Sequence, residues 1–349
     1  MEVEYAPEKS EKRKKEKDSK KKKNKKQKKD KKQKKKDEKK RKKHKKEKKR
    51  RIGSSISRKA EDQESESDDG DEAADRIIRS PVPEADHKLK GFIDLFENAI
   101  AKYPEKGVFI DFYGGEGKAA ARADSKYGLI GVVIDTKNHP AWDLHTEGVL
   151  SYISKKVSSG RVKGSHVATD CRSLSSARHG KPGGNCPRPL RDYHENTWGF
   201  PDLCGKDRAT LENGNKDARL TLGLVDVFKK NQVPISVENG DNSILWHIPE
   251  MAERLDEARI FKVDYCMMGR MYRKRTRLAA WALTNTRVAD QVEKQCQDKF
   301  HCLTKNKMCC RTKKPHLILR GWVRGKAIAS QGQVYPRKFA NLITKLLLS

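Results

Sequence analysis

The segment VFIDFYGGEG, residues 108–117, gives the strongest indication of how this chain folds. Its first half is an apolar run of strand length, and the glycines Gly114, Gly115 and Gly117 follow at once. Glycines in such a place allow a tight turn into a helix and a close approach of the backbone to a ligand. The pattern is not GxGxxG, and no Gly-Lys-Ser or Gly-Lys-Thr follows, which excludes a P-loop. The turn is compatible with a dinucleotide, a phosphate or no ligand.

Outward from this segment, apolar runs alternate with stretches of helical periodicity. We expect strands at residues 107–112, 131–135, 165–169, 233–237, 261–265 and 277–283, and helices at residues 88–103, 118–127, 146–157, 218–230 and 249–258. This alternation predicts an α/β fold with a doubly wound, mostly parallel sheet. Ligands bind such sheets at the carboxyl ends of the strands. Four motifs stand at those ends, so we expect them to form one site.

Two acidic or nucleophilic groups follow the next strands. Asp135 ends the second strand, where a carboxylate typically accepts hydrogen bonds from ribose hydroxyls; the alternative is a solvated loop carboxylate. Cys171 lies in HVATDCRSLS, residues 166–175, just after the third strand. A structural cysteine is more often found inside an apolar strand, whereas a reactive thiol prefers a loop near positive charge, for which Arg172, Arg178 and His179 are candidates. Both interpretations of Cys171 stay open on these grounds.

Two further motifs carry charge at the ends of apolar strands. In PISVENG, residues 234–240, Glu238 and Asn239 end a buried strand, and a charge there usually has a function or an ionic partner. In YRKRTRLAAW, residues 272–281, three arginines alternate and would point to one face of a strand. Such a face needs acids or phosphates nearby, or it is a solvated edge. A salt bridge between the two motifs is the structural alternative for Glu238.

In this order, VFIDFYGGEG, HVATDCRSLS, PISVENG and YRKRTRLAAW resemble the signature blocks of the cytosine-5 methyltransferases, from residue 108 to the C-terminus. The resemblance implies a Rossmann-like methyltransferase fold and S-adenosylmethionine as methyl donor. It implies that Cys171 attacks carbon-6 of cytosine and that Glu238 contacts the ring nitrogen and the exocyclic amine. Asn239 would then hold the nucleophile loop. Arginines of the family block correspond to Arg275, which would stabilise the activated base, and to Arg277.

The resemblance also implies a set of cofactor residues. These are Asp111, Phe112, Gly114, Gly115 and Gly117 around the methionine part, Asp135 at the ribose, and Asp143 near the adenine. The segment GQVYPRKFANLITKLL is similar to the last family block, a turn and helix that return to the cofactor pocket, where Gly332 and Tyr335 fit. The pieces ARHG and YP are similar to methylases carried by mobile elements of protists. Asp170 stands where the family usually has proline, and its carboxylate is expected to raise the thiol pKa.

The segment QCQDKFHCLTKNKMCCRTKKPHL is rich in cysteine and histidine. Zinc takes four nitrogen or sulfur ligands, and Cys302, Cys309, Cys310 and His316 are the set we expect, with Cys296 or His301 as alternative members. The spacing has no clean C-x-x-C pair, so surface thiols in a basic loop are the alternative. Residues 290–320 stand where the family carries its target-recognition region. Residues 178–215 form a long insertion that is also a candidate for DNA contact.

Charge divides the chain into three parts. Residues 1–60 contain 32 Lys or Arg and 10 Asp or Glu, which is +22 of the total +31. We expect them to be a disordered tail that targets the nucleus and attracts nucleic acid without sequence preference; a solubility device is the alternative. Residues 61–85 form an acidic linker, and residues 86–349 form the methyltransferase-like domain. No apolar run approaches 18 residues, so we expect no membrane partner. The eight cysteines predict reduced thiols in an intracellular protein.

Together these features predict a nuclear DNA cytosine-5 methyltransferase that uses S-adenosylmethionine. Two alternatives remain open at this point. The first keeps the fold and changes the substrate to RNA. The second is a catalytically inactive, nucleic-acid-binding relative, which Asp170 before the cysteine and the short recognition segment favour.

Overall fold

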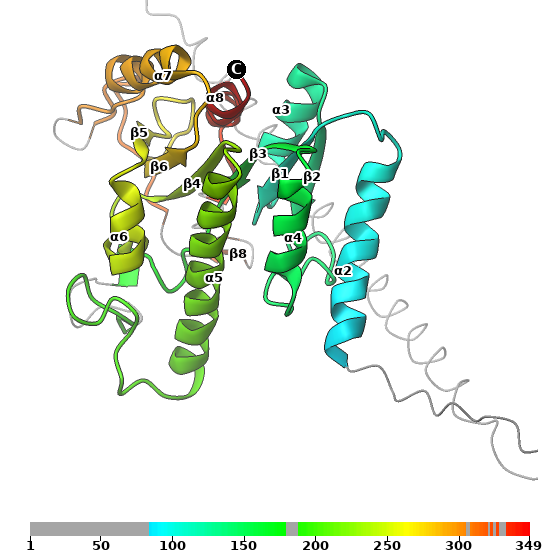
Figure 1. Cartoon of the computed structure of the whole chain (residues 1–349). Coiled ribbons are helices and arrows are strands. Elements are labelled where there is room, and N and C mark those ends of the chain that lie inside the picture. The colour runs from blue at the N-terminus through cyan, green and yellow to red at the C-terminus, as the bar shows by residue number, and fades with distance from the viewer. Residues whose placement is uncertain (1–83, 179–187, 305–307, 320–321, 324–325, 328–332) are drawn as a thin grey trace, which may run out of the picture. The chain divides into compact units, whose positions relative to one another are not determined.

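A computed structural model describes residues 84–178, 188–304, 308–319, 322–323, 326–327 and 333–349. The expected tail at residues 1–60, the linker up to residue 83, and Gly332 lie outside these residues. The described part is an α/β structure built on one mixed sheet (Figure 1). None of the described helices is both long enough and apolar enough to cross a membrane.

Six strands form the sheet in the order β2-β1-β3-β4-β6-β5. Their bounds are Val108–Phe112 for β1, Ile130–Ile134 for β2, Val162–Val167 for β3, Ile235–Gly240 for β4, Arg259–Asp264 for β5 and Arg275–Trp281 for β6. The pairs β1–β2, β1–β3 and β3–β4 are parallel, and β6 runs antiparallel between β4 and β5. The expected α/β class with a mostly parallel sheet is therefore confirmed.

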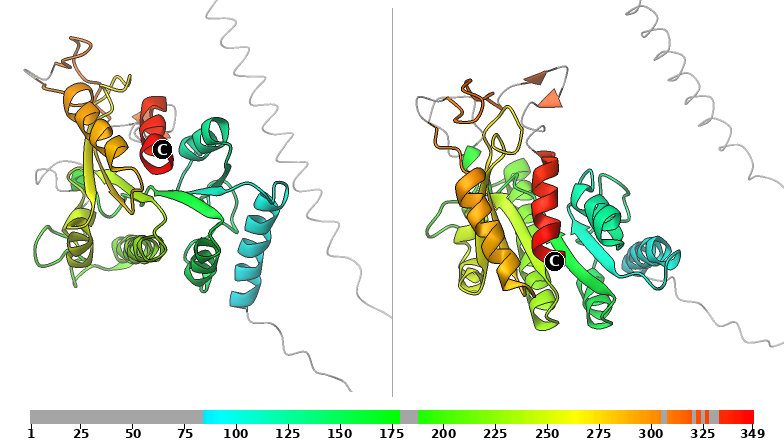
Figure 2. Two further views of the ribbon diagram at one scale, coloured as in Figure 1. Left: turned by 45° about the horizontal axis from the view of Figure 1, so that its top comes forward. Right: turned by 90° about the horizontal axis from the view of Figure 1, so that it is seen from above.

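Helices cover both faces of the sheet (Figures 1 and 2). One face carries α3 (Lys118–Tyr127), α7 (Thr286–Lys299) and α8 (Arg337–Leu348); the other carries α2 (Glu84–Ala101), α4 (Val149–Ser158), α5 (Gly205–Lys230) and α6 (Pro249–Leu255). Short 3-10 turns at Ser176–Arg178 and Ile244–His247 and a small ribbon of β7 (Trp322–Val323) and β8 (Lys326–Ala327) complete the described elements. A hydrophobic core fills each side of the sheet.

Strand β1 shows why its sequence is apolar at almost every position. Ile110 and Phe112 pack in the core toward α4 and α5, and Phe109 packs in the core toward α3 and α8. A strand covered on both faces buries both sets of alternating side chains. Asp111 points to the same side as Phe109, where it meets the first turn of α3. The continuous apolar run is thus a consequence of burial on two faces.

The strand order reverses at β1. From β1 the chain passes through α3 to β2 on one side, and then through α4 to β3 on the other side. Such a switch point leaves a crevice at the carboxyl ends of the two neighbouring strands, here β1 and β3. The glycine turn follows β1 and Cys171 follows β3, so both adjoin this crevice.

Two expected segments differ in the structure. Helix α5 begins at Gly205 rather than at residue 218, so the last part of the long insertion, residues 205–215, is helical. Residues 290–320 are not one irregular segment, because α7 occupies their first part and packs on β5 and α8. Ala289, Val292 and Cys296 bury one face of α7 at helical spacing. Only the described residues between Phe300 and β7 form an irregular, Cys- and His-containing segment.

Candidate functional site

A cavity of about 700 Å³ opens at the carboxyl ends of β1, β2, β3 and β4. This is the size range of small-molecule and cofactor sites. Among the predicted site residues, those that line it are Gly114, Gly115, Asp135, Asp143, Cys171, Glu238, Asn239 and Tyr335. Residues separated by more than 200 positions in the sequence therefore share one cavity.

The turn after β1 forms one wall of the cavity. Gly115 has a φ of +55°, and a Cβ atom added there would meet nothing within 4 Å. Its N–H donates to Asp135 Oδ2 at 3.0 Å, and Asn138 Nδ2 donates to the Gly115 carbonyl at 3.1 Å. These bonds join the turns after β1 and β2. The left-handed backbone and the open space in front of it leave room for a ligand close to the chain.

Three predicted cofactor residues lie behind this turn and do not line the cavity. Asp111 is fully buried, and its Oδ2 accepts the N–H of Ala120 at 3.3 Å. Burial raises the pKa of Asp111 to about 7. Phe112 belongs to the core, and Gly117 packs so closely that a Cβ atom would lie 2.5 Å from Val133 Cγ2. These residues shape the turn rather than face a ligand.

Cys171 forms the opposite wall, in the loop after β3. Burial raises the pKa of its thiol; the positive charge of Lys274 opposes this effect, and the charges of Asp170 and Glu238 add to it. Asp170 is itself paired, because Arg172 Nε lies 2.7 Å from its Oδ2 and the Arg172 N–H donates to its Oδ1 at 2.8 Å. The expected influence of Asp170 on the thiol is thus present, but it is second to burial.

Glu238 is held by two donors at the end of β4. Lys274 Nζ donates to Oε1 at 3.1 Å, and Tyr335 Oη donates to Oε2 at 2.9 Å. Asn239 Nδ2 donates to the carbonyl of Thr169 at 3.0 Å, two residues before Cys171. The Glu-Asn pair therefore orients a carboxylate in the cavity and fixes the start of the cysteine loop.

A buried histidine positions Tyr335, and through Tyr335 the carboxylate of Glu238. His166 Nδ1 lies 2.8 Å from Ser236 Oγ, and its Nε2 lies 2.9 Å from Tyr335 Oη. Burial lowers the pKa of His166 to about 3, so the ring is neutral. Because Tyr335 donates to Glu238, His166 Nε2 donates to Tyr335, and Nδ1 accepts from Ser236. The chain of hydrogen bonds positions Tyr335, which precedes α8, at the cavity.

The structure adds cavity residues that the sequence did not indicate. Asp217, on the buried side of α5, accepts a hydrogen bond from Tyr113 Oη at 2.8 Å, and His145 Nε2 lies 2.8 Å from the same oxygen. The hydrogen bond with Asp217 raises the pKa of His145. The carboxylate lies in a long polar helix, where only the tertiary fold shows that it faces inward. Lys274 is a further lining residue that the sequence did not indicate.

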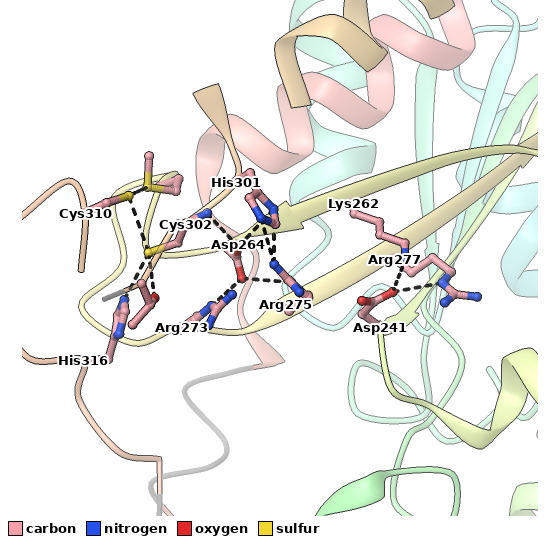
Figure 3. A network of polar contacts seen from close by, with 12 residues as sticks. Asp241, Lys262, Asp264, Arg273, Arg275, Arg277, His301, Cys302, Cys310 and His316 are labelled. Carbon is pink, nitrogen blue, oxygen red and sulfur yellow. Dashed lines mark hydrogen bonds and ion pairs between the residues drawn. The ribbon is translucent and has the colours of Figure 1, made fainter. Parts of the chain in front are cut away.

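The arginines predicted to act on the base do not line the cavity. Arg273 Nε and Arg275 Nε lie 2.9 and 3.7 Å from Oδ1 of the fully buried Asp264, and Arg277 Nε lies 3.1 Å from Asp241 Oδ1 (Figure 3). Arg275 and Arg277 are thus paired with acids outside the cavity. Alternate side chains along an extended chain point to opposite sides. Lys274 stands between Arg273 and Arg275, so its side chain leaves the chain on the opposite side and points to the cavity.

A second group lies outside the cavity. One potential ligand atom from each of Cys266, Cys302, Cys309 and His316 lies within 4.8 Å of every other, so this group can hold a metal ion. Cys266, which precedes β6, was not in the expected set. Cys310 is not in the group, Cys296 is buried in α7, and His301 contacts Arg275. Burial raises the pKa of the Cys309 thiol, but hydrogen bonds with Thr312, Arg311 and His316 together lower it to about 6.

No model of a known protein family matches the sequence, and a search of curated proteins finds no significant match.

Proposed function

We propose that this protein is a cytosine-5 methyltransferase that transfers the methyl group of S-adenosylmethionine to cytosine in DNA. The observation that carries the proposal is the shared cavity. Its first wall, Gly114 to Asp135, has the open glycine turn and strand-end carboxylate expected of a nucleoside cofactor site. Its second wall has a cysteine beside a carboxylate and a cation, as attack on an electron-poor ring requires.

In the proposed reaction the target cytosine leaves the base stack of the DNA and enters the cavity, where it lies against the second wall. Cys171 Sγ forms a bond to carbon-6, and Glu238 stabilises the ring nitrogen and exocyclic amine. The cofactor, when bound, would supply the methyl group for carbon-5 and leave as S-adenosylhomocysteine. A proton acceptor then removes the proton from carbon-5, which releases the Cys171 thiolate and restores the carbon-5–carbon-6 double bond of the ring. Lys274 supplies positive charge next to Cys171 and Glu238, whereas Arg275, to which the resemblance assigns stabilisation of the activated base, does not line the cavity.

The fold is compatible with a doubly wound, Rossmann-like methyltransferase. Its strand order reverses between β1 and β3, which is where the proposed cofactor and nucleophile walls meet. The basic N-terminal tail supports a nucleic-acid substrate and a nuclear location, because its +22 charge would attract phosphates.

A catalytically inactive nucleic-acid-binding protein is the second candidate. It is favoured by the position of Cys171, whose thiol is largely shielded from solvent; this shielding raises the pKa of the thiol and lowers the thiolate fraction at neutral pH. In an active protein, the Cys171 thiol would have to lose its proton as the base binds. The two candidates differ in turnover and not in cofactor binding.

The test is transfer of labelled methyl from S-adenosylmethionine to DNA and to RNA by the wild type, Cys171→Ser and Cys204→Ser. Cys204 is exposed and does not line the cavity, so its variant is a matched control. We expect methylated DNA from the wild type and the control, and a loss of at least about a thousandfold in Cys171→Ser. Methylation of RNA alone would change the substrate. Equal activity of Cys171→Ser would exclude the cysteine mechanism.

Cofactor binding is tested separately by calorimetry with S-adenosylhomocysteine. Gly115→Val would place a branched side chain into the open space before the turn, and Asp135→Ala would remove the strand-end carboxylate. We expect both to weaken binding at least about tenfold, while Cys171→Ser binds as the wild type does. Unchanged affinity in both variants would remove the cofactor assignment. Binding without turnover by the wild type would favour the inactive candidate.

A further inference from the structure

We propose that Cys266, Cys302, Cys309 and His316 hold a structural Zn²⁺ ion, which fastens the chain at Cys302, Cys309 and His316 to the connection between β5 and β6. The proposal does not depend on the proposed reaction, because none of the four residues lines the cavity. Three of them come from the irregular segment after α7. The fourth, Cys266, comes from the connection that follows β5 and lies 36 positions earlier in the sequence than Cys302.

The distances suit a tetrahedral ion. A thiolate and an imidazole on one tetrahedral Zn²⁺ are about 3.6 Å apart, and two thiolates are about 3.8 Å apart, given the usual bond lengths. Cys302 Sγ lies 3.7 Å from His316 Nε2 (Figure 3), and all four ligand atoms lie within 4.8 Å of one another. An ion would have to draw the widest pair together by at most about 1 Å.

The donor set selects zinc and a structural role. Three sulfur atoms and one imidazole nitrogen suit a borderline-soft ion of tetrahedral preference. The four protein ligands would close the coordination shell and leave no position for a substrate. Cys266, Cys302 and Cys309 are each at most 2% exposed, so solvent does not compete for the site. Both features are typical of a site that contributes to folding rather than to chemistry.

The segment needs such a support, since it has little apolar core of its own. Among the described residues between Phe300 and β7, which make up this segment, Leu303, Met308, Leu317 and Ile318 are exposed, whereas Cys302 and Cys309 are buried. The described part of the segment contains no helix and no pairing beyond the single bridge between Met308 and Pro315. A short region that cannot bury enough apolar surface is commonly stabilised by a metal.

Hydrogen bonds around the group join the same two parts of the chain that the proposed zinc ion would join. Cys302 N–H donates to Oδ2 of the buried Asp264 at 2.8 Å, and Arg311 Nε donates to the carbonyl of Cys266 at 2.6 Å. Both bonds join the segment to the end of β5 and the connection beyond it. The ion would therefore reinforce an attachment that the chain already makes, with Asp264 at its base (Figure 3).

Cys310 gives a matched control within the same segment. Its Sγ lies 3.6 Å from Cys302 Sγ, yet it contacts Met267 Sδ at 3.4 Å and is not one of the four. Metal analysis of the full-length protein, purified without chelator from zinc-supplied cells, would compare Cys266→Ser and His316→Ala with Cys310→Ser. We expect about one zinc ion per chain in the wild type and in Cys310→Ser, and loss of the ion in the other two.

A second measurement uses only the wild type, so it does not require that a variant folds. The folded protein is treated with a thiol-alkylating reagent before and after a strong chelator, and peptides are analysed by mass spectrometry. We expect Cys266, Cys302 and Cys309 to become reactive only after chelation, with Cys310 reactive before it. A zinc-free wild type, a disulfide within the group, or equal zinc loss in Cys310→Ser and Cys266→Ser would each overturn the proposal.

Discussion

At the level of single residues, the alternation of side-chain directions along residues 273–277 decides which positively charged side chain faces the cavity. Arg275 and Arg277 point to Asp264 and Asp241, and Lys274 between the motif's arginines points to Glu238 and the cavity. A like-charged neighbour one position away cannot replace it, since its side chain leaves the extended chain on the other side. In the proposed reaction, Lys274 is thus the group that favours the Cys171 thiolate.

Replacing Lys274 by methionine should raise the pKa of the Cys171 thiol. Removal of a positive charge disfavours the thiolate, so the pH at which alkylation reaches half its maximal rate should move upward by about one pH unit. Site-resolved alkylation of Cys171 by iodoacetamide between neutral and alkaline pH measures this. Lys274→Arg should keep the wild-type profile, because it keeps the charge.

Lys262→Met is the matched control, since Lys262 pairs with Asp241 and does not line the cavity. It removes the same charge from a nearby strand and should leave the Cys171 profile unchanged. If Lys274→Met and Lys262→Met gave the same profile as the wild type, Lys274 would have no influence on the thiol. The measurement needs no substrate, so it stands apart from the methylation assay.

At the level of secondary-structure elements, the contact between α3 and β2 is close enough to require glycine at residue 131. A Cβ atom on Gly131 would lie 2.3 Å from the Ala120 carbonyl oxygen and 2.6 Å from its carbon. Backbone cannot move as easily as the end of a side chain, so only glycine allows the helix to pack this closely. The same helix receives Asp111 at its first turn, which ties the glycine turn to the sheet.

Gly131→Ala should therefore destabilise the fold. Overpacking at a rigid contact typically costs about 1–3 kcal/mol, and we expect about 2 kcal/mol from urea denaturation. Gly240→Ala is the control, because a Cβ atom there meets nothing within 4 Å and the backbone is not left-handed. It should change the free energy of unfolding by less than about 0.5 kcal/mol. Equal midpoints for the two variants would show that α3 can shift without cost.

At the level of the molecule, charge and chemistry are divided between parts of the chain. Residues 1–60 carry +22 of the +31 net charge, whereas the cavity and its side chains belong to residues 84–349. In the proposed protein the tail would provide affinity for phosphates, and the cavity would provide the chemistry. Electrostatic attraction of this kind weakens as salt is added, because the release of counterions then gains less free energy.

Deletion of residues 1–60 should weaken DNA binding and flatten its dependence on salt. For each phosphate that the protein no longer neutralises, the slope of log K against log salt becomes shallower by about 0.9. Fluorescence anisotropy with duplex DNA at several salt concentrations measures the slope. Calorimetry with S-adenosylhomocysteine serves as the control, since cofactor affinity should not change. An unaltered slope would mean that the tail does not bind DNA.

Local patterns along the chain were enough to predict the class of fold and much of the cavity. Apolar periodicity and glycine turns are local signals, so the strands β1 to β4 and the positions of Gly115, Asp135, Cys171 and Glu238 at their ends could be predicted within a few residues. The start of α5 and the existence of α7 were less accessible, because both begin in polar stretches where burial, not composition, selects the helix.

Which side chains meet, by contrast, is settled by packing in three dimensions. Packing places Lys274, and neither Arg275 nor Arg277, at the cavity, and it brings Asp217 of α5 there as well. It also places Cys266 beside Cys302, Cys309 and His316. Such groupings depend on the direction of each side chain and on the antiparallel position of β6, which joins residues far apart in the chain. Periodicity and spacing describe neighbours along the chain, whereas a site is made by neighbours in space.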